Sequence, residues 1–145
     1  KAWGLASVRL GYIAADPSVV NQLQKVKTLL DINLFAIKAV SLLIDNYHLV
    51  ESHIEEIKFS KQYIGSSLSS HNIEYFLGDA NFVHFRPPFS IDPDQFSTAL
   101  GSYGFRVRST SHTNTVLDGC IRITIGSHQQ MLALASSISE LLKNH

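Results

Sequence analysis

The sequence of 145 residues has little of several features that define particular protein classes. Its single cysteine, Cys120, excludes an internal disulfide framework and a cysteine-rich zinc site and is typical of a reducing compartment. Twelve basic and twelve acidic residues cancel, so the chain lacks the basic excess that favours nucleic acid or an anionic membrane surface. No apolar run approaches the roughly 18–20 residues of a membrane span, and no signal peptide pattern opens the chain. We therefore expect a cytoplasmic protein whose partners include neither nucleic acid nor membrane.

The chain also lacks the residue spacing of a metal site. It has seven histidines, but His48 and His53 are five residues apart, which does not place two ligands on one helix face. His84 falls in a predicted strand, and no carboxylate cluster joins the others. We expect no bound metal. By contrast, apolar residues make up 45% of the chain and charged residues 17%, which is enough for a packed core.

The first half of the chain predicts one strand followed by helices. Residues 10–15 form an almost unbroken apolar run, typical of a strand buried on both faces within a larger sheet. Asp16 and Pro17 are typical of a helix start, followed by apolar residues at helical spacing up to Leu30. Further helical patterns cover residues 34–44 and 50–68, the latter interrupted only by Lys61.

The second half changes to a mixed pattern of short strands and helices. A strand is predicted at residues 81–86, a helix from Asp92, strands at 105–108 and 120–125, and a closing helix over 131–141. This order, strand, helix, strand, strand, helix, indicates a small α+β layer with helices packed on one face of a sheet.

Alternation in the last two strands places arginines on one sheet face. If Phe105 and Val107 point into the core, Arg106 and Arg108 point away from it, and the isoleucines that flank Arg122 orient that residue outward as well. Like charges on one face repel unless an anion neutralises them, and guanidinium groups suit bidentate capture of a carboxylate or phosphate. A solvated strand face with scattered arginines is the alternative interpretation.

The chain opens with KAWGLASVRLGYIAAD, which resembles the segment around the cofactor lysine of fold-type I pyridoxal-phosphate aminotransferases (class I/II), especially the histidinol-phosphate aminotransferase group. The matching positions are Lys1, Trp3, Gly4, Leu5, Ala6, Arg9 and Gly11. The resemblance continues in DANFVHFRPP, GFRVR and GCIRITIGSHQQM, at residues 79–88, 104–108 and 119–131. These stretches stand in the family's order with similar spacings, and the match spans essentially the whole chain.

The resemblance implies a role for several residues. Lys1 would be the catalytic lysine, which binds pyridoxal 5'-phosphate and moves a proton at the substrate Cα. Arg9 would bind the cofactor phosphate, and Arg122 the substrate α-carboxylate. Arg108 is a looser match to an arginine that contacts substrate, and Asn81 matches a family position without an assigned chemistry.

The resemblance also implies an organisation and an activity. The parent would have an α/β fold, of which residues 1–32 are the tail of the large cofactor-binding domain and residues 33–145 the connecting helices and the small C-terminal domain. The intact homodimer would transfer an amino group between an amino acid, including a phosphorylated, histidinol-phosphate-like one, and a 2-oxo acid. The 145 residues alone are expected to be inactive, since most cofactor-holding residues of the family lie before the lysine.

Two other functions are open. A related decarboxylase acting on a phosphorylated amino acid shares much of the same C-terminal pattern. A non-catalytic domain that binds a small anion or a protein partner through the arginine face would need no cofactor. In every case an apolar run at residues 10–15 without a surrounding sheet predicts association or aggregation of the isolated chain.

Overall fold

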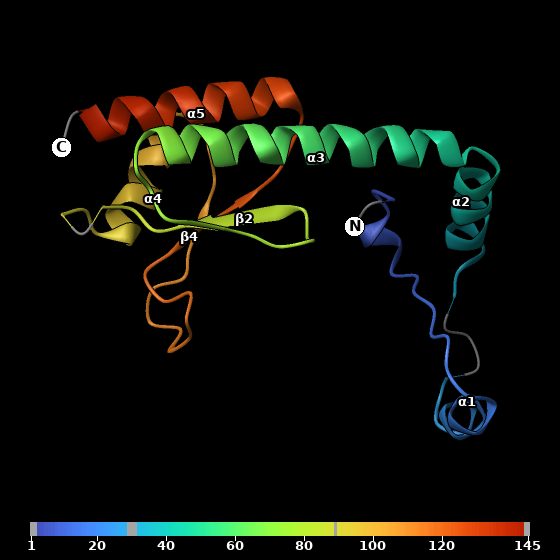
Figure 1. The fold of residues 1–145 in the computed structure, drawn as a ribbon. Coiled ribbons are helices and arrows are strands. Elements are labelled where there is room, and N and C mark those ends of the chain that lie inside the picture. The colour runs from blue at the N-terminus through green and yellow to red at the C-terminus, as the bar shows by residue number, and fades with distance from the viewer. Residues whose placement is uncertain (1–2, 29–31, 89, 144–145) are drawn as a thin grey trace. The chain divides into compact units, whose positions relative to one another are not determined.

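The computed structural model describes residues 3–28, 32–88 and 90–143. The chain divides into two compact units, Lys1–His53 and Ile54–His145, each described by itself (Figure 1). The first unit contains a short 3₁₀ turn η1 (Ala6–Val8), the helices α1 (Pro17–Gln24) and α2 (Leu34–Asp45), and the start of α3 (Tyr47–Ser70). Among the described residues, no helix combines the length and the apolar character that crossing a bilayer requires.

Side-chain caps begin the two shorter helices. Asp16 Oδ1 accepts the backbone N–H of Ser18 at 2.8 Å, and Pro17 occupies the first helical position, as predicted. In the same way Asn33 Oδ1 accepts the backbone N–H of Ala36 at 2.8 Å. Each cap satisfies an N–H group that has no partner within its helix.

Two expectations for the first unit are not met. The strand predicted at residues 10–15 is wrong, because this segment is extended without strand pairing, with Tyr12 95% and Ile13 70% exposed. A strand needs a neighbour to bond with its N–H and C=O groups, and the described residues of this unit supply none. In addition α1 ends at Gln24, before the apolar spacing does, and Leu30 lies outside the described residues.

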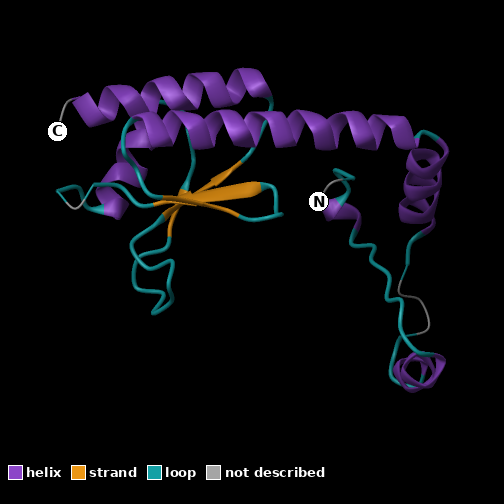
Figure 2. Cartoon of the chain, viewed as in Figure 1, coloured by secondary structure: helices purple, strands orange, loops and turns teal. Residues whose placement is uncertain are grey.

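The second unit has the predicted mixture of helices and a small antiparallel sheet. It contains the remainder of α3 and then β1 (Tyr75–Leu77), β2 (Phe82–Phe85), α4 (Pro93–Ser102), β3 (Arg108–Ser109), β4 (Ile121–Thr124) and α5 (His128–Lys143) (Figure 2). The strands lie in the order β1-β2-β4-β3, and every neighbouring pair is antiparallel. The α+β expectation is confirmed, with β1 as an unpredicted strand and β3 shorter than predicted.

One face of this sheet builds the core. Val83 and Phe85 of β2 and Ile121 and Ile123 of β4 are 0–1% exposed. Helices α3, α4 and α5 pack their apolar residues against this face, among them Ile64, Leu68, Phe96, Leu100, Met131, Leu134 and Ile138. The strands and the helices thus form two layers, and the other sheet face remains outside the core.

Lys61, which interrupts the apolar side of α3, is explained by the turn between β1 and β2. Its ammonium donates hydrogen bonds to the carbonyl oxygens of Gly78 and, at 2.8 Å, Ala80. The aliphatic stem lies along the helix while the charged end satisfies two carbonyl groups of the turn. Lys61 therefore fixes the β1–β2 turn to α3.

We expect Lys61→Met to weaken the second unit, because the two turn carbonyls lose a charged donor. The free energy of unfolding should fall by about 1–3 kcal/mol, the usual cost of removing a hydrogen bond to a charged group. Urea denaturation followed by circular dichroism measures this loss. Lys58→Met is the matched control, since exposed Lys58 pairs with Glu55 one turn away on the same helix. Equal midpoints for the two variants would contradict the assignment.

Candidate functional site

The open face of the sheet carries a row of four side chains, one from each strand. Cross-strand partners are Phe76 with His84, His84 with Arg122, and Arg122 with Arg108. Partners in register project to the same face, and these positions alternate with the buried residues of β2 and β4. The prediction that Arg108 and Arg122 share one outward face is confirmed. We call Phe76, His84, Arg122 and Arg108 the cross-strand row.

Aromatic contacts hold the central part of the row. Arg122 is half-buried, and its Cζ lies 5.4 Å from the centroid of the Phe82 ring. The Phe82 ring in turn meets His84 edge-on, with centroids 5.3 Å apart. The guanidinium is therefore supported on a ring face, a contact that leaves its N–H groups free for a ligand.

The row is positively charged and has no acidic partner in the described part of the chain. Arg108 is exposed, and the guanidinium groups of Arg108 and Arg122 form no hydrogen bond or ion pair there. Two guanidinium groups directly opposite each other repel, so their positions are better suited to an anion than to stability. Burial, and after it the charge of Arg122, lower the pKa of the His84 imidazole below its ordinary value.

The third arginine expected on this face is not part of the row. Arg106 is exposed and precedes β3, which begins at Arg108. His84 takes the third place instead, on the other side of Arg122. The outward position of His84 could have been predicted from the sequence, because strand side chains alternate and Val83 and Phe85 point inward.

Arg86 is a second residue for which sequence analysis gave no role. Its Nε donates to Glu74 Oε2 at 3.0 Å, and Nη1 and Nη2 donate to the carbonyl oxygens of Asp118 at 2.7 Å and Val116 at 3.4 Å. These bonds fasten the loop of residues 110–120 to the end of β2. Arg86 is thus a structural arginine.

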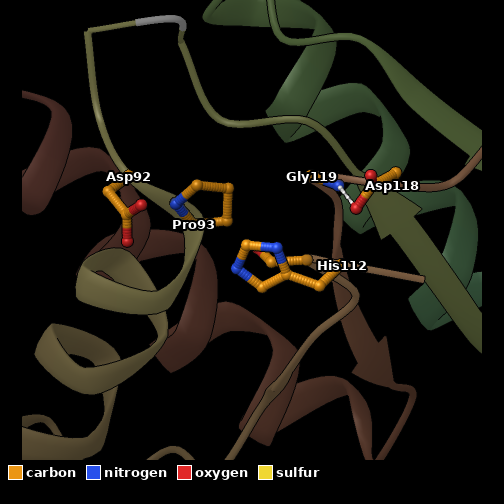
Figure 3. A pocket seen from close by; sticks show the side chains of 6 residues that line it. Asp92, Pro93, His112, Asp118 and Gly119 are labelled. Atoms are coloured by element: carbon orange, nitrogen blue, oxygen red, sulfur yellow. Dashed lines mark hydrogen bonds between the residues drawn. The ribbon is translucent and has the colours of Figure 1, made fainter. Parts of the chain in front are cut away.

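A pocket lies between the start of α4 and this loop (Figure 3), and it is lined by Asp92, Pro93, Ser111, His112, Asp118 and Gly119. Its carboxylates already serve the backbone. Asp92 Oδ1 accepts the N–H groups of Asp94 and Gln95 at 2.9 Å, and Asp118 Oδ1 accepts that of Gly119 at 3.0 Å. In the described ranges no three histidine, cysteine, aspartate or glutamate residues are grouped to hold a metal ion.

The remaining predicted site residues are not members of the cross-strand row. Lys1 is outside the described residues. Arg9 belongs to the first unit, where it ends η1 with a left-handed φ of 55° and is exposed. Its guanidinium forms no ion pair with the described acidic residues. Asn81, just before β2, has a buried Oδ1 without a hydrogen-bond partner in the described part.

Cys120 is a packing residue. It is 0% exposed, and burial raises the pKa of its thiol above the ordinary value. The thiol therefore stays protonated near neutral pH, and a nucleophilic role is not supported.

Comparison with known proteins identifies the family to which this chain belongs. The sequence pattern of the family "Aminotransferase class I and II" matches residues 1–138, so the chain belongs to this family. Among its relatives, the histidinol-phosphate aminotransferase of Chromobacterium violaceum is 29% identical over 136 residues, which are 93% of this chain and 37% of that protein. The chain thus spans a little over a third of the length of the curated relatives it matches.

Solved structures show the same fold. The histidinol-phosphate aminotransferase of Sinorhizobium meliloti, in complex with pyridoxal 5'-phosphate, aligns with a TM-score of 0.81 and 21% identity over 99% of this chain and 39% of that one. The L-threonine-O-3-phosphate decarboxylase of Porphyromonas gingivalis aligns with a TM-score of 0.80 and 18% identity over 98% of this chain and 44% of that one. At these identities the likeness bears on the fold alone.

Arg86→Met should loosen the loop of residues 110–120 without disturbing the core. We expect faster amide exchange in this loop and a loss of about 1–3 kcal/mol in unfolding free energy, because two carbonyl groups lose a charged donor. Hydrogen exchange read by NMR measures the effect. Glu74→Gln is the control: it removes the ion pair but keeps both carbonyl contacts, so the loop should exchange as before. Equal loop exchange in both variants would show that the carbonyl contacts do not hold the loop.

Proposed function

We propose that this chain is the C-terminal part of a pyridoxal-phosphate-dependent aminotransferase that transfers an amino group between an amino acid and a 2-oxo acid. The observation that carries the proposal is the pairing of Arg108 with Arg122 on the open sheet face without an acidic partner in the described part. The family membership and the histidinol-phosphate aminotransferase relatives support the reaction type.

The two arginines suit the two anionic ends of a phosphorylated amino acid. Arg122 is half-buried and supported by Phe82, so its guanidinium loses little freedom when it binds the α-carboxylate through two parallel hydrogen bonds. Arg108 is exposed at the edge strand and is free to follow a second anionic group such as a phosphate. We therefore propose a phosphorylated substrate. In one of the histidinol-phosphate type, which has no carboxylate, the phosphate would be the group that Arg122 holds, with Arg108 beside it.

The cofactor would be held by residues of the first unit. Arg9 fits a phosphate contact, because its guanidinium is exposed and forms no ion pair with the described acids. Pyridoxal phosphate, when bound, supplies an aldehyde that condenses with amines and a ring that accepts electron density from the substrate Cα. Lys1 would take the proton from Cα and return it, which an amine of lowered pKa does near neutral pH.

The intact protein would be a cytoplasmic homodimer, as the resemblance implies. The substrate partners are then the small amino acid and 2-oxo acid. We propose the domain division of residues 1–32 and 33–145 for the same reason, with the first part completing the cofactor domain of the parent.

In the full-length protein, Arg122→Ala should lower kcat/KM for every amino donor. The expected loss is about 10- to 150-fold, since a hydrogen bond to a charged group contributes about 1.5–3 kcal/mol. Arg108→Ala should lower kcat/KM for phosphorylated donors more than for unphosphorylated ones. Steady-state assay of 2-oxo acid formation measures both effects. Arg106→Ala, close in sequence but outside the row, is the control.

The same assay separates the alternatives. Release of carbon dioxide from a phosphorylated amino acid in place of amino transfer would identify the related decarboxylase, the second candidate, which shares the fold of this chain. If full-length Arg122→Ala retains its activity while anion binding to the 145 residues is lost, the face is a non-catalytic anion site. Unchanged kinetics in both arginine variants would contradict the proposed substrate contacts.

The 145 residues alone should not transfer amino groups when pyridoxal phosphate is added, because their described part supplies Arg9 as the phosphate contact and little else for the ring. Absorbance titration with the cofactor and an assay of 2-oxo acid formation check this. The full-length protein, assayed in parallel, is the positive control. Turnover by the isolated chain at the rate of the full-length protein would refute this part of the proposal.

A further inference from the structure

His84 occupies the position in the cross-strand row that is next to Arg122, on the side away from Arg108. The register pairs β2 with β4 so that His84 and Arg122 are direct partners. His84 is half-buried, and its ring forms no hydrogen bond with the described residues; its contact is the edge-on stacking with Phe82. A polar ring thus stands beside an unpaired guanidinium with its donor and acceptor capacity unused.

The charged groups around His84 are arginines, and the acid near them, Glu74, is already paired with Arg86. Arg122 on β4 is the near charge, and Arg108 on β3 lies one strand further. On the other side β1 presents the apolar Phe76. Beyond the end of β2 the Arg86 guanidinium is paired with Glu74 at 3.0 Å. The helices of the unit pack on the opposite sheet face, so no described carboxylate stabilises a cationic imidazole here.

We infer that His84 is a specificity-determining residue of the anion site: it donates a hydrogen bond to the group that Arg122 holds when that group is a doubly charged phosphate in place of a carboxylate. This inference rests on the proposed function for the location of the site. Without a ligand, the neighbouring Arg122 disfavours the protonated ring; an anion bound to Arg122 removes that repulsion and adds an attraction. A proton from the solvent then enters the imidazole as the anion binds, and leaves with it.

The coupling between anion binding and protonation of His84 has a definite sign. The pKa of His84 is low in the free protein and rises in the complex, so the anion is bound more tightly at acidic pH. Affinity then falls as the pH rises through the pKa of the complex. A merely structural histidine, held by Phe82 for packing, would show no such dependence on the ligand.

NMR of the histidine rings in the 145-residue chain tests the inference. Long-range proton–nitrogen spectra follow each ring from pH 4.5 to 8 in sulfate, which stays doubly charged over this range, and in chloride at equal ionic strength. His84→Gln assigns the His84 signal, and exposed His48 on α3 is the internal reference. We expect sulfate to raise the pKa of His84 by about 0.5 or more, and sulfate affinity to fall about threefold or more between pH 5 and 8. In His84→Gln this pH dependence of sulfate affinity should be absent.

An unchanged His84 titration in sulfate overturns the inference. If the Arg122 Nε signal still moves with sulfate in that case, the anion face of the proposed function stands without His84. If Arg122 also fails to respond, the proposed substrate contact loses its support as well. A sulfate shift of His84 that persists in Arg122→Ala would show a separate site and would also overturn the shared one.

The full-length enzyme supplies a second readout. His84→Gln should lower kcat/KM for donors that place a doubly charged phosphate on Arg122 more than for those that place a carboxylate there, and more at pH 6 than at pH 8. The glutamine retains an N–H donor and comparable volume but cannot be protonated, so a packing role alone would leave this ratio unchanged. Equal losses for both substrate classes at both pH values would contradict the inference.

Discussion

The register between β2 and β4 is the constraint on which the second unit depends. Because strand side chains alternate, one register decides at once which residues fill the core and which form the open face. Val83 opposite Ile123 closes the core, and His84 opposite Arg122 then stands on the other side. A slip by one residue would move a guanidinium into the apolar layer, at a cost of several kcal/mol. Core packing therefore also positions the candidate site.

Three arginines of the second unit differ in the groups that surround their guanidinium groups. Arg86 donates hydrogen bonds to Glu74 and to two loop carbonyl groups, so it stabilises the fold. Arg122 and Arg108 are cross-strand partners without an acid in the described part, and their like charges lower the stability of the sheet. The proposed anionic substrate would supply the opposing charge.

The two units contribute different groups to the proposed chemistry. The second unit holds the residues proposed for the substrate, which the sheet arranges in one row. The first unit holds the residues proposed for the cofactor, Lys1 and Arg9. Extended backbone with exposed Tyr12 and Ile13 takes the place of the predicted strand, since a strand buried on both faces requires partner strands that these residues do not contain.

Local patterns were enough for the helices and for the inward and outward sides of the strands. Asp16 and Asp92 marked helix starts because a cap acts within three residues, and the alternation around Arg122 showed its outward side because it depends on neighbours in the chain alone. Strand order was beyond such patterns: β2 and β4 are adjacent through contacts between residues about 40 positions apart. Only that pairing made His84 a neighbour of Arg122. Packing of α3 against the β1–β2 turn gave Lys61 its carbonyl partners, and the start of β3 at Arg108 left Arg106 outside the row. These relations depend on long-range packing, which no local spacing encodes.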